Sequence, residues 1–348
     1  MAEDNSLARR YARFVVRRIV VLTALAVALV LSFLGDAATG PSALPLVDVL
    51  NGLLNPAGLS RSAEVILWNI RLPAAAMAVV VGAALGLAGA EMQTVLNNPL
   101  ASPFTLGISN AATFGASLAI VLELSLFGFD QTVMVPACAF VFAMGSILVI
   151  QALARTQGTT ADTVVLFGIA MVFVMNALLW LVQFVASADA LQQIVFWTMG
   201  SLARATWDKV ALVALVLAVC LPLSLRHVWA MTALRGGEEH ARSFGIPVER
   251  LRMLVMLRVS LLAAAAVAFV GTVGFIGLVG PHIARLALGE DHRFYLPGAA
   301  LAGALVLSLA SIAAKTLVPG LLLPVGIVTA LVGIPLFMAL ILSQRRNA

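Results

Sequence analysis

Apolar segments of roughly twenty residues, the length a helix needs to cross a bilayer, recur from one end of this chain to the other. Short stretches rich in Pro, Gly and charge separate them. A spanning helix satisfies its backbone hydrogen bonds internally, so the pattern predicts an all-α polytopic membrane protein with about ten transmembrane helices. The predicted helices are 19–35, 66–92, 100–122, 131–153, 163–187, 207–226, 255–275, 276–289, 295–317 and 324–343. The segment at 276–289 is too short to span alone, and nine spans is the alternative.

Composition supports membrane burial along the whole length. Of the 348 residues, 62% are hydrophobic and 11% are charged, whereas charged residues make up roughly 25% of soluble domains. We expect one transmembrane domain at 19–343, between tails at 1–18 and 344–348. The arginine-rich start could be a secretion signal, but no small-x-small cleavage site follows at Asp36-Ala37-Ala38, which favours a retained helix.

The arginines predict an orientation. With the N-terminus in the cytoplasm, the four basic residues outside are Arg61, Arg71, Arg204 and Lys209. The fifteen inside are Arg9, Arg10, Arg13, Arg17, Arg18, Arg155, Arg226, Arg235, Arg242, Arg250, Arg252, Arg285, Arg293, Arg345 and Arg346. This asymmetry follows the positive-inside rule and predicts two cytoplasmic termini. The net charge of +5 does not indicate nucleic-acid binding, because the bases form no face with interleaved aromatics.

The cytoplasmic loop at 227–252 is strongly charged and contains a predicted short helix. Its first turn is acidic, Gly245 is a stop signal, and Pro247 blocks continuation. Such a helix can transmit force to a soluble partner, although an ordinary solvated loop helix is the alternative. The candidate coupling residues are Gly237, Glu238, Glu239, His240, Ala241, Arg242, Ser243, Phe244 and Gly245.

The sequence contains no motif for chemistry of its own. Neither Lys209 nor Lys315 lies in a G-x-x-x-x-G-K-[ST] loop, so any ATP must be hydrolysed by a separate chain. The four histidines have no metal-ligand spacing, and we expect neither a metal site nor a cofactor. Instead, glycines at three- and four-residue spacing predict close helix packing. These are Gly82, Gly86, Gly89, Gly271, Gly274 and Gly277.

Several stretches, in order, resemble the FecCD/BtuC-type permeases, the membrane subunits of iron-siderophore, haem and vitamin B12 ABC importers. They cover roughly four-fifths of the chain, from Arg71 onward. The matching stretches are Arg71-Leu72-Pro73, Gly89-Ala90-Glu91-Met92-Gln93, Asn98-Pro99-Leu100-Ala101-Ser102-Pro103, Trp197-Thr198-Met199-Gly200-Ser201-Leu202, 237–245, 274–285, Asp291-His292-Arg293, 323–330 and 333–337.

This resemblance implies the type II ABC importer fold, with ten helices per subunit. It also implies a dimer with an identical or sibling permease, two cytoplasmic ATP-binding subunits, an external binding protein and the bacterial inner membrane. The helix at 238–245 looks like the family's coupling helix. Arg71 and Lys315 match external basic positions that meet acids on the binding protein. Ala74, Ser311 and Leu322 depart from the family pattern, which has Arg, Asp and Glu there.

The resemblance favours a ferric siderophore or similar iron chelate as the substrate, with haem and vitamin B12 as alternatives. A secondary transporter driven by protons or sodium is a rival from another class. Such transporters usually carry acids in mid-helix as relays, and Glu91 is the one candidate in this sequence.

Overall fold

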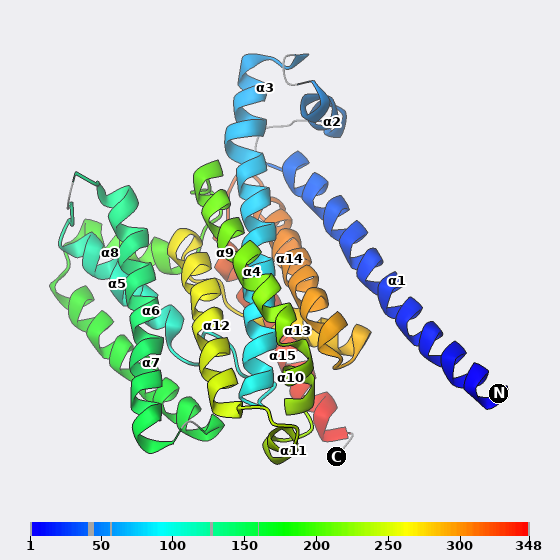
Figure 1. Cartoon of the computed structure of the whole chain (residues 1–348). Helices are drawn as coiled ribbons and strands as arrows, with labels where there is room; N and C mark the ends of the chain where they lie inside the picture. The colour runs from blue at the N-terminus through cyan, green and yellow to red at the C-terminus, as the bar shows by residue number, and fades with distance from the viewer. Residues whose placement is uncertain (1, 41–44, 56–57, 126–127, 159, 347–348) are drawn as a thin grey trace.

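The computed structural model describes residues 2–40, 45–55, 58–125, 128–158 and 160–346, which fold almost entirely into helices (Figure 1). In chain order these are α1 (Ala2–Ala38), α2 (Leu46–Leu54), α3 (Arg61–Val65), the π-helical η2 (Ile66–Arg71), α4 (Leu72–Val95), α5 (Ile108–Val121), α6 (Gln131–Gln157), α7 (Ala161–Val185), α8 (Ala188–Thr198), α9 (Trp207–Arg226), α10 (Val228–Leu234), α11 (Glu238–Ser243), α12 (Val248–Val270), α13 (Ile276–Leu288), α14 (His292–Thr316) and α15 (Val325–Arg346).

Within the described residues, seven helical segments are long and apolar enough to cross a membrane. They are α1, the continuous helix Arg61–Val95, α6, α7, α9, α12 and α14, and three shorter apolar helices, α5, α13 and α15, accompany them. These seven and three correspond one to one with the ten segments predicted from the sequence. The prediction of an all-α polytopic membrane protein is therefore confirmed.

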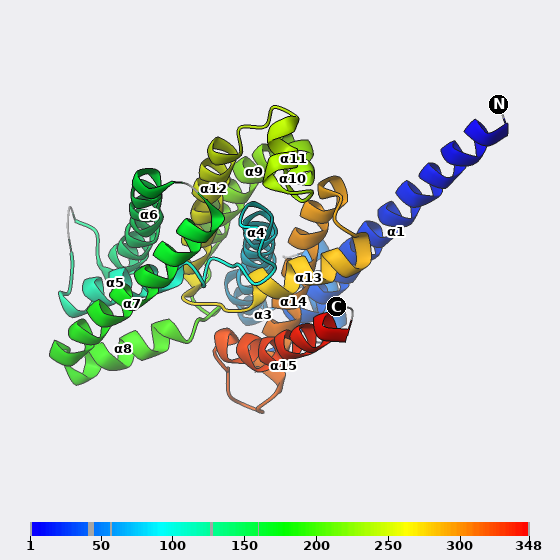
Figure 2. The ribbon, with the colours of Figure 1, turned by 90° about the horizontal axis from the view of Figure 1, so that it is seen from below.

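Helix α4 lies at the centre of the bundle (Figures 1 and 2). It packs against α9, α12, α13 and α14, and nearly all of its side chains are buried. Its sequence is rich in Ala and Gly, and small side chains let neighbouring helices approach closely where lipid supplies no hydrophobic force between them. The central position of α4 follows from this composition.

Helices α1 and α7 lie at the periphery with their apolar faces open. The most apolar stretch of α1 has no buried residue, and only 17% of that of α7 is buried. Large side chains such as Phe173 and Trp180 of α7 are exposed. An apolar surface of this extent is stable only against lipid or another protein.

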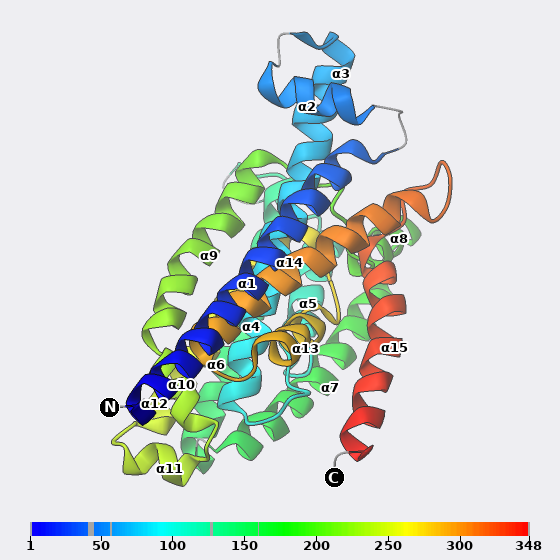
Figure 3. The same ribbon diagram turned by 90° about the vertical axis from the view of Figure 1, so that its right-hand side faces the viewer.

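The molecule has two distinct ends (Figure 3). Helices α2 and α3 and the α14–α15 turn lie at one end, which we call the outer end. Helix α11 and both described chain ends lie toward the opposite end, which we call the inner end.

Several predicted helix boundaries were wrong, and the local backbone explains two of them. The helix predicted at 100–122 begins only at Ile108, because turns precede it. The backbone N–H of Leu100 donates to Asn98 Oδ1 (2.9 Å), and that of Ser102 donates to Thr105 Oγ1 (3.0 Å); such local bonds compete with helix formation. The helix predicted at 255–275 is α12, which begins earlier, at Val248, and ends at Val270 because Gly271 has a φ of +80°.

The structure also contains short helices that the sequence analysis did not predict: α2, α8 and α10. A capping signal precedes α8, where Ser187 Oγ accepts a hydrogen bond from the N–H of Ala190 (3.3 Å). The first predicted helix, 19–35, is longer than expected, because α1 begins at Ala2 within the predicted tail at 1–18. Residues 347–348 of the predicted C-terminal tail lie outside the described residues.

Candidate functional site

The loop between α9 and α12 folds into two short helices at the inner end of the molecule. Helix α11 covers Glu238–Ser243 and lies between two glycines with positive φ, Gly237 (+109°) and Gly245 (+78°). Glycine adopts such angles without steric cost. Figures 1 and 3 show α11 at the edge of the bundle, where a soluble partner can reach it.

Helix α11 is connected to the bundle through charged side chains. Arg252 of α12 is buried, forms an ion pair with Glu238 and donates from Nε to the Val95 carbonyl at the end of α4 (3.0 Å). Arg242 bonds Glu249 (2.7 Å) and Glu238 (3.0 Å). The hydrogen bond to Glu249 raises the pKa of the Arg242 guanidinium. Arg252 thus links α11 directly to the end of α4.

A second contact joins the loop to α4 through His292 at the start of α14. Its ring nitrogens lie 2.8 Å from Thr94 Oγ1 of α4 and 3.1 Å from Thr232 Oγ1 of α10. His292 is fully buried, so this hydrogen-bonding site fixes α10 against the core. Both short helices of the loop are thus tied to the same end of α4.

An exposed aromatic cluster lies beside α11. Trp229 of α10 is 63% exposed, and its ring packs edge-to-face on Phe244, with centroids 5.9 Å apart. The ring of His240 also packs edge-to-face with Phe244, with centroids 4.8 Å apart. Exposed aromatics beside charged residues are typical of the energetic centres of protein interfaces. Trp229 was missed in the sequence analysis, although an aromatic side chain in a charged loop could have indicated it.

The acid considered as a possible relay, Glu91, is fully buried and paired. Arg258 of α12 holds it through several hydrogen bonds, among them Nε to Glu91 Oε2 (2.9 Å), and its Nη1 donates to the Leu223 carbonyl of α9 (3.4 Å). The pair joins α4, α12 and α9. Its partners are 167 positions apart in the chain, which is why sequence inspection did not find it.

The six glycines that were predicted to pack helices closely differ in their surroundings. A Cβ at Gly82 or Gly86 would overlap the backbone of α14 at Gly303 or Ala299. A Cβ at Gly89 would overlap the backbone of Gly277, so these two predicted glycines lie in direct contact. Gly271 and Gly274 lie in the link between α12 and α13. A Cβ at Gly274 would make only an ordinary contact with Phe104, at 3.9 Å.

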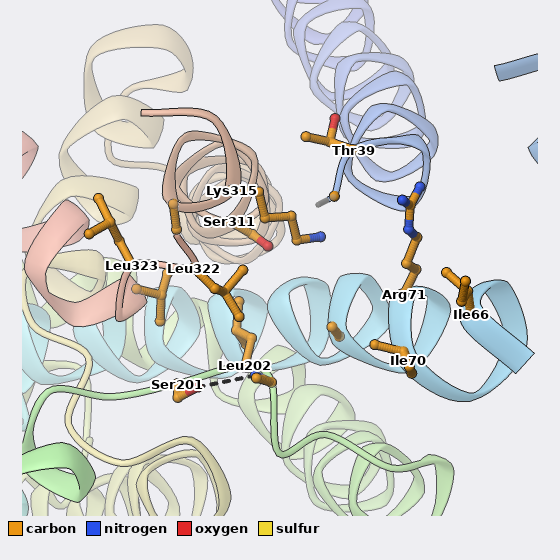
Figure 4. Close-up of a pocket in the computed structure, with 15 residues that line it drawn as sticks. Thr39, Ile66, Ile70, Arg71, Ser201, Leu202, Ser311, Lys315, Leu322 and Leu323 are labelled. Atoms are coloured by element: carbon orange, nitrogen blue, oxygen red, sulfur yellow. Dashed lines mark hydrogen bonds between the residues drawn. The ribbon is translucent and has the colours of Figure 1, made fainter. Parts of the chain in front are cut away.

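Arg71 and Lys315 line a pocket of about 300 Å³ at the outer end, together with Ala74, Ser311 and Leu322 (Figure 4). The three positions that depart from the family pattern thus gather at one place, and the lining there is largely apolar.

Both pocket cations contact the last turn of α1. Lys315 Nζ lies 2.7 Å from Asp36 Oδ1, and Ser311 Oγ donates to the same oxygen (2.9 Å). Arg71 Nη1 donates to the carbonyls of Ala38 (2.7 Å) and Ala37 (3.3 Å). The C-terminal carbonyls of a helix need such donors and carry partial negative charge. The two cations therefore position the outer end of α1.

Among the described residues, no group of three or more His, Cys, Asp or Glu side chains could hold a metal ion. Cys138 and Cys220 are both free thiols.

Comparison with known proteins finds a matching family and relatives that cover nearly the whole length of the chain. Residues 23–343 match the model of the FecCD transport family. A Methanocaldococcus jannaschii protein named as an ABC transporter permease is 37% identical, with 97% of this chain and 99% of the relative covered. The hemin transport system permease protein HmuU of Yersinia pestis is 37% identical over 93% of this chain and 95% of the relative.

A further relative and a solved structure are also similar to this chain. The vitamin B12 import system permease protein BtuC of Salmonella paratyphi A is 37% identical over 83% of this chain and 87% of the relative. A solved structure described as an inward-facing conformation of a metal-chelate type ABC transporter matches with a TM-score of 0.81 and 28% identity, over 93% of this chain and 99% of that one. The chain is therefore a member of the FecCD transport family, an ABC importer permease of the FecCD/BtuC type.

Proposed function

We propose that this permease carries a ferric siderophore or a similar iron chelate across the bacterial inner membrane, with both of its termini in the cytoplasm. It pairs with a second permease, identical or sibling, and binds two cytoplasmic ATP-binding subunits and an external binding protein. A loaded binding protein docks outside, ATP closes the two ATP-binding subunits, and residues 237–245 transmit that motion to the helices.

The observation that carries the proposal is the connection from α11 to α4. An exposed helix bordered by aromatic side chains is bound, through the buried Arg252, to the end of the most buried helix. The loop can therefore receive force from a soluble subunit and pass it to the centre of the bundle. An ordinary solvated loop helix does not need a buried arginine in this position.

The pairing of the buried charges argues against an ion-driven secondary transporter. Glu91 binds Arg258, and Asp36 binds Lys315. Relay acids in such transporters must gain and lose protons, and a carboxylate held by a buried guanidinium is poorly suited to this. The pairing supports ATP-driven transport.

The substrate class rests on the relatives. One is named for hemin, one for vitamin B12, and a solved neighbour for a metal chelate. All three names refer to metal complexes, and the proposed ferric siderophore or similar iron chelate belongs to this class. Haem and vitamin B12 are the alternatives within the family.

The binding protein docks, in this proposal, on the outer end around the pocket that Arg71 and Lys315 line. Lys315 is only 9% exposed in its ion pair with Asp36. These cations therefore act on an acidic partner mainly through their positive potential and through the position of α1, and less through direct contact.

The experiment is uptake into proteoliposomes that contain the permease, its ATP-binding subunits and its binding protein. Labelled ferric siderophores, haem and cobalamin are supplied in parallel, with and without ATP inside. We expect ATP-dependent accumulation of a ferric siderophore. Accumulation of haem or cobalamin alone would move the substrate to the alternatives, and uptake driven by a proton gradient without ATP would refute the transport mechanism.

A further inference from the structure

A basic pocket of about 500 Å³ lies between the arginine-rich part of α1 and the end of α13. Figure 2 shows these two helices side by side. Arg10, Arg13, Arg17 and Arg18 line it from α1, and residues 286–289 line it from α13. Residues 10, 13 and 17 recur at three- and four-residue spacing, so they project from one face of the helix. The pocket is thus formed by two helices that are far apart in the sequence.

The positive charge of this pocket is poorly compensated within the protein. Arg10, Arg13 and Arg17 have no ion-pair partner among the side chains that the structure describes. Arg18 Nη1 is buried, lies 3.8 Å from Asp291 and lacks a hydrogen-bond partner there. Asp291 itself is shared with Arg293 (2.6 Å). A buried guanidinium nitrogen without an acceptor is rare in folded proteins. The Phe14 ring, which also lines the pocket, covers part of this guanidinium, with its centroid 3.4 Å from the Arg18 guanidinium carbon. The uncompensated charge of the pocket therefore comes mainly from Arg10, Arg13 and Arg17.

The surroundings of the pocket are apolar on the membrane side. On α1, Val16 lies among the arginines and Ile19 and Val20 follow them, and all three are more than half exposed. Leu286, on the opposite wall, is 75% exposed. The uninterrupted apolar run of α1 begins at Ile19, directly after Arg18, so the arginines lie where the hydrocarbon region meets the headgroups. A soluble anion would make no favourable contact with these apolar walls, whereas acyl chains would.

We propose that this pocket binds the phosphate headgroup of an anionic phospholipid in the leaflet at the inner end, with the acyl chains along the exposed face of α1. Basic pockets between transmembrane helices on the cytoplasmic side suit such headgroups. Four guanidinium groups also suit a headgroup with two phosphates. Arginines that only fix topology need neither a second wall from α13 nor an unsatisfied buried nitrogen.

The test measures lipid binding to the full-length permease in a mild detergent by native mass spectrometry. The probes are tetraoleoyl cardiolipin, dioleoyl phosphatidylglycerol and dioleoyl phosphatidylcholine. Arg13→Gln with Arg17→Gln removes two pocket charges. The matched control is Arg226→Gln with Arg250→Gln, which removes two inner-end arginines outside the pocket. Ala287→Trp fills the pocket without changing its charge.

We expect the wild type to bind the anionic lipids in preference to phosphatidylcholine. The pocket double variant should bind cardiolipin roughly thirtyfold more weakly, the effect expected for two arginines near an anionic surface. Ala287→Trp should also weaken binding, and the control pair should bind as the wild type does. Because this readout is independent of transport, it stands or fails separately from the proposed function.

Three results would overturn the proposal. Equal losses in the pocket and control pairs would show diffuse charge attraction instead of a site. Normal binding by Ala287→Trp would place the lipid outside the pocket. Displacement of cardiolipin by inorganic pyrophosphate at equal concentration would show that the site takes a soluble anion.

Discussion

The guanidinium of Arg252 joins two segments that a loop movement would otherwise separate. It pairs with Glu238 on α11 and donates to the Val95 carbonyl on α4. Hydrogen bonds that involve a charged group are worth about 1.5–3 kcal/mol, more than neutral ones. Arg250, two positions earlier, is exposed on the same helix, so the chain offers a natural control.

We predict that Arg252→Gln loosens α11 while Arg250→Gln does not. Loss of a charge-assisted hydrogen bond of about 1.5 kcal/mol or more corresponds to at least a tenfold change in the local opening equilibrium. Amide hydrogen exchange of the peptide that contains 238–243 should therefore accelerate about tenfold in Arg252→Gln. Equal exchange in the two variants would show that Arg252 does not hold the loop.

The buried pair Glu91–Arg258 gives a second prediction at this scale. Removing one partner of a buried ion pair leaves an unpaired charge and costs about 3–5 kcal/mol, whereas replacing both is far milder. We expect Arg258→Gln to lower the Tm of the purified permease strongly, and Glu91→Gln combined with Arg258→Gln to restore much of the loss. Additive effects in this double-mutant cycle would show that the two side chains are not coupled.

Helix α4 packs closely against α13 and α14 because glycines, which have no side chain, lie at the contacts. Its Gly89 faces the backbone of Gly277 with no room for a Cβ. Gly145 of α6 is the contrasting case, because a Cβ there would meet nothing within 4 Å. Both glycines lie inside helices, so the same substitution tests packing with helix propensity held equal.

We predict that Gly89→Ala destabilises the permease and Gly145→Ala does not. Overpacking in a tight core costs about 1–3 kcal/mol, while Gly to Ala in an open helix position gains up to about 1 kcal/mol. Thermal unfolding in detergent should give a lower Tm for Gly89→Ala and an equal or higher one for Gly145→Ala. A Tm unchanged by Gly89→Ala would contradict the close approach of α4 and α13.

The elements also show how far sequence can predict this molecule. Hydropathy predicted all ten apolar helices because lipid forces each span to be long and apolar. The acidic turn and Gly245 likewise predicted the loop helix. Sequence could not show that Lys315 pairs with Asp36, 279 positions away, or that Arg258 pairs with Glu91. Tertiary packing brings these partners together, and no local sequence pattern marks them.

The whole molecule must have one orientation in the membrane if α11 is to meet the ATP-binding subunits. The arginine asymmetry predicts that α11 and both termini lie in the cytoplasm and that the loop after α5 lies outside. We predict that a single cysteine at Glu239, on a background without Cys138 and Cys220, is not labelled by an impermeant thiol reagent in intact spheroplasts. A cysteine at Glu123 should be labelled readily. The opposite pattern would invert the topology and remove the basis for an ATPase contact at α11.

We propose above that α11 couples ATP hydrolysis to transport. The number of chelates imported per ATP, measured in proteoliposomes with the complete transporter, tests this directly. Gly245→Pro disrupts the end of α11, because proline cannot adopt its φ of +78° and removes the N–H that donates to the Arg242 carbonyl (2.9 Å). Gly158→Pro is the control, at a positive-φ glycine (+94°) in open space after α6. We predict that Gly245→Pro inserts normally but imports no more chelate with ATP than without it. Gly158→Pro should import as much chelate per ATP as the wild type does. A wild-type ratio in Gly245→Pro would contradict the account.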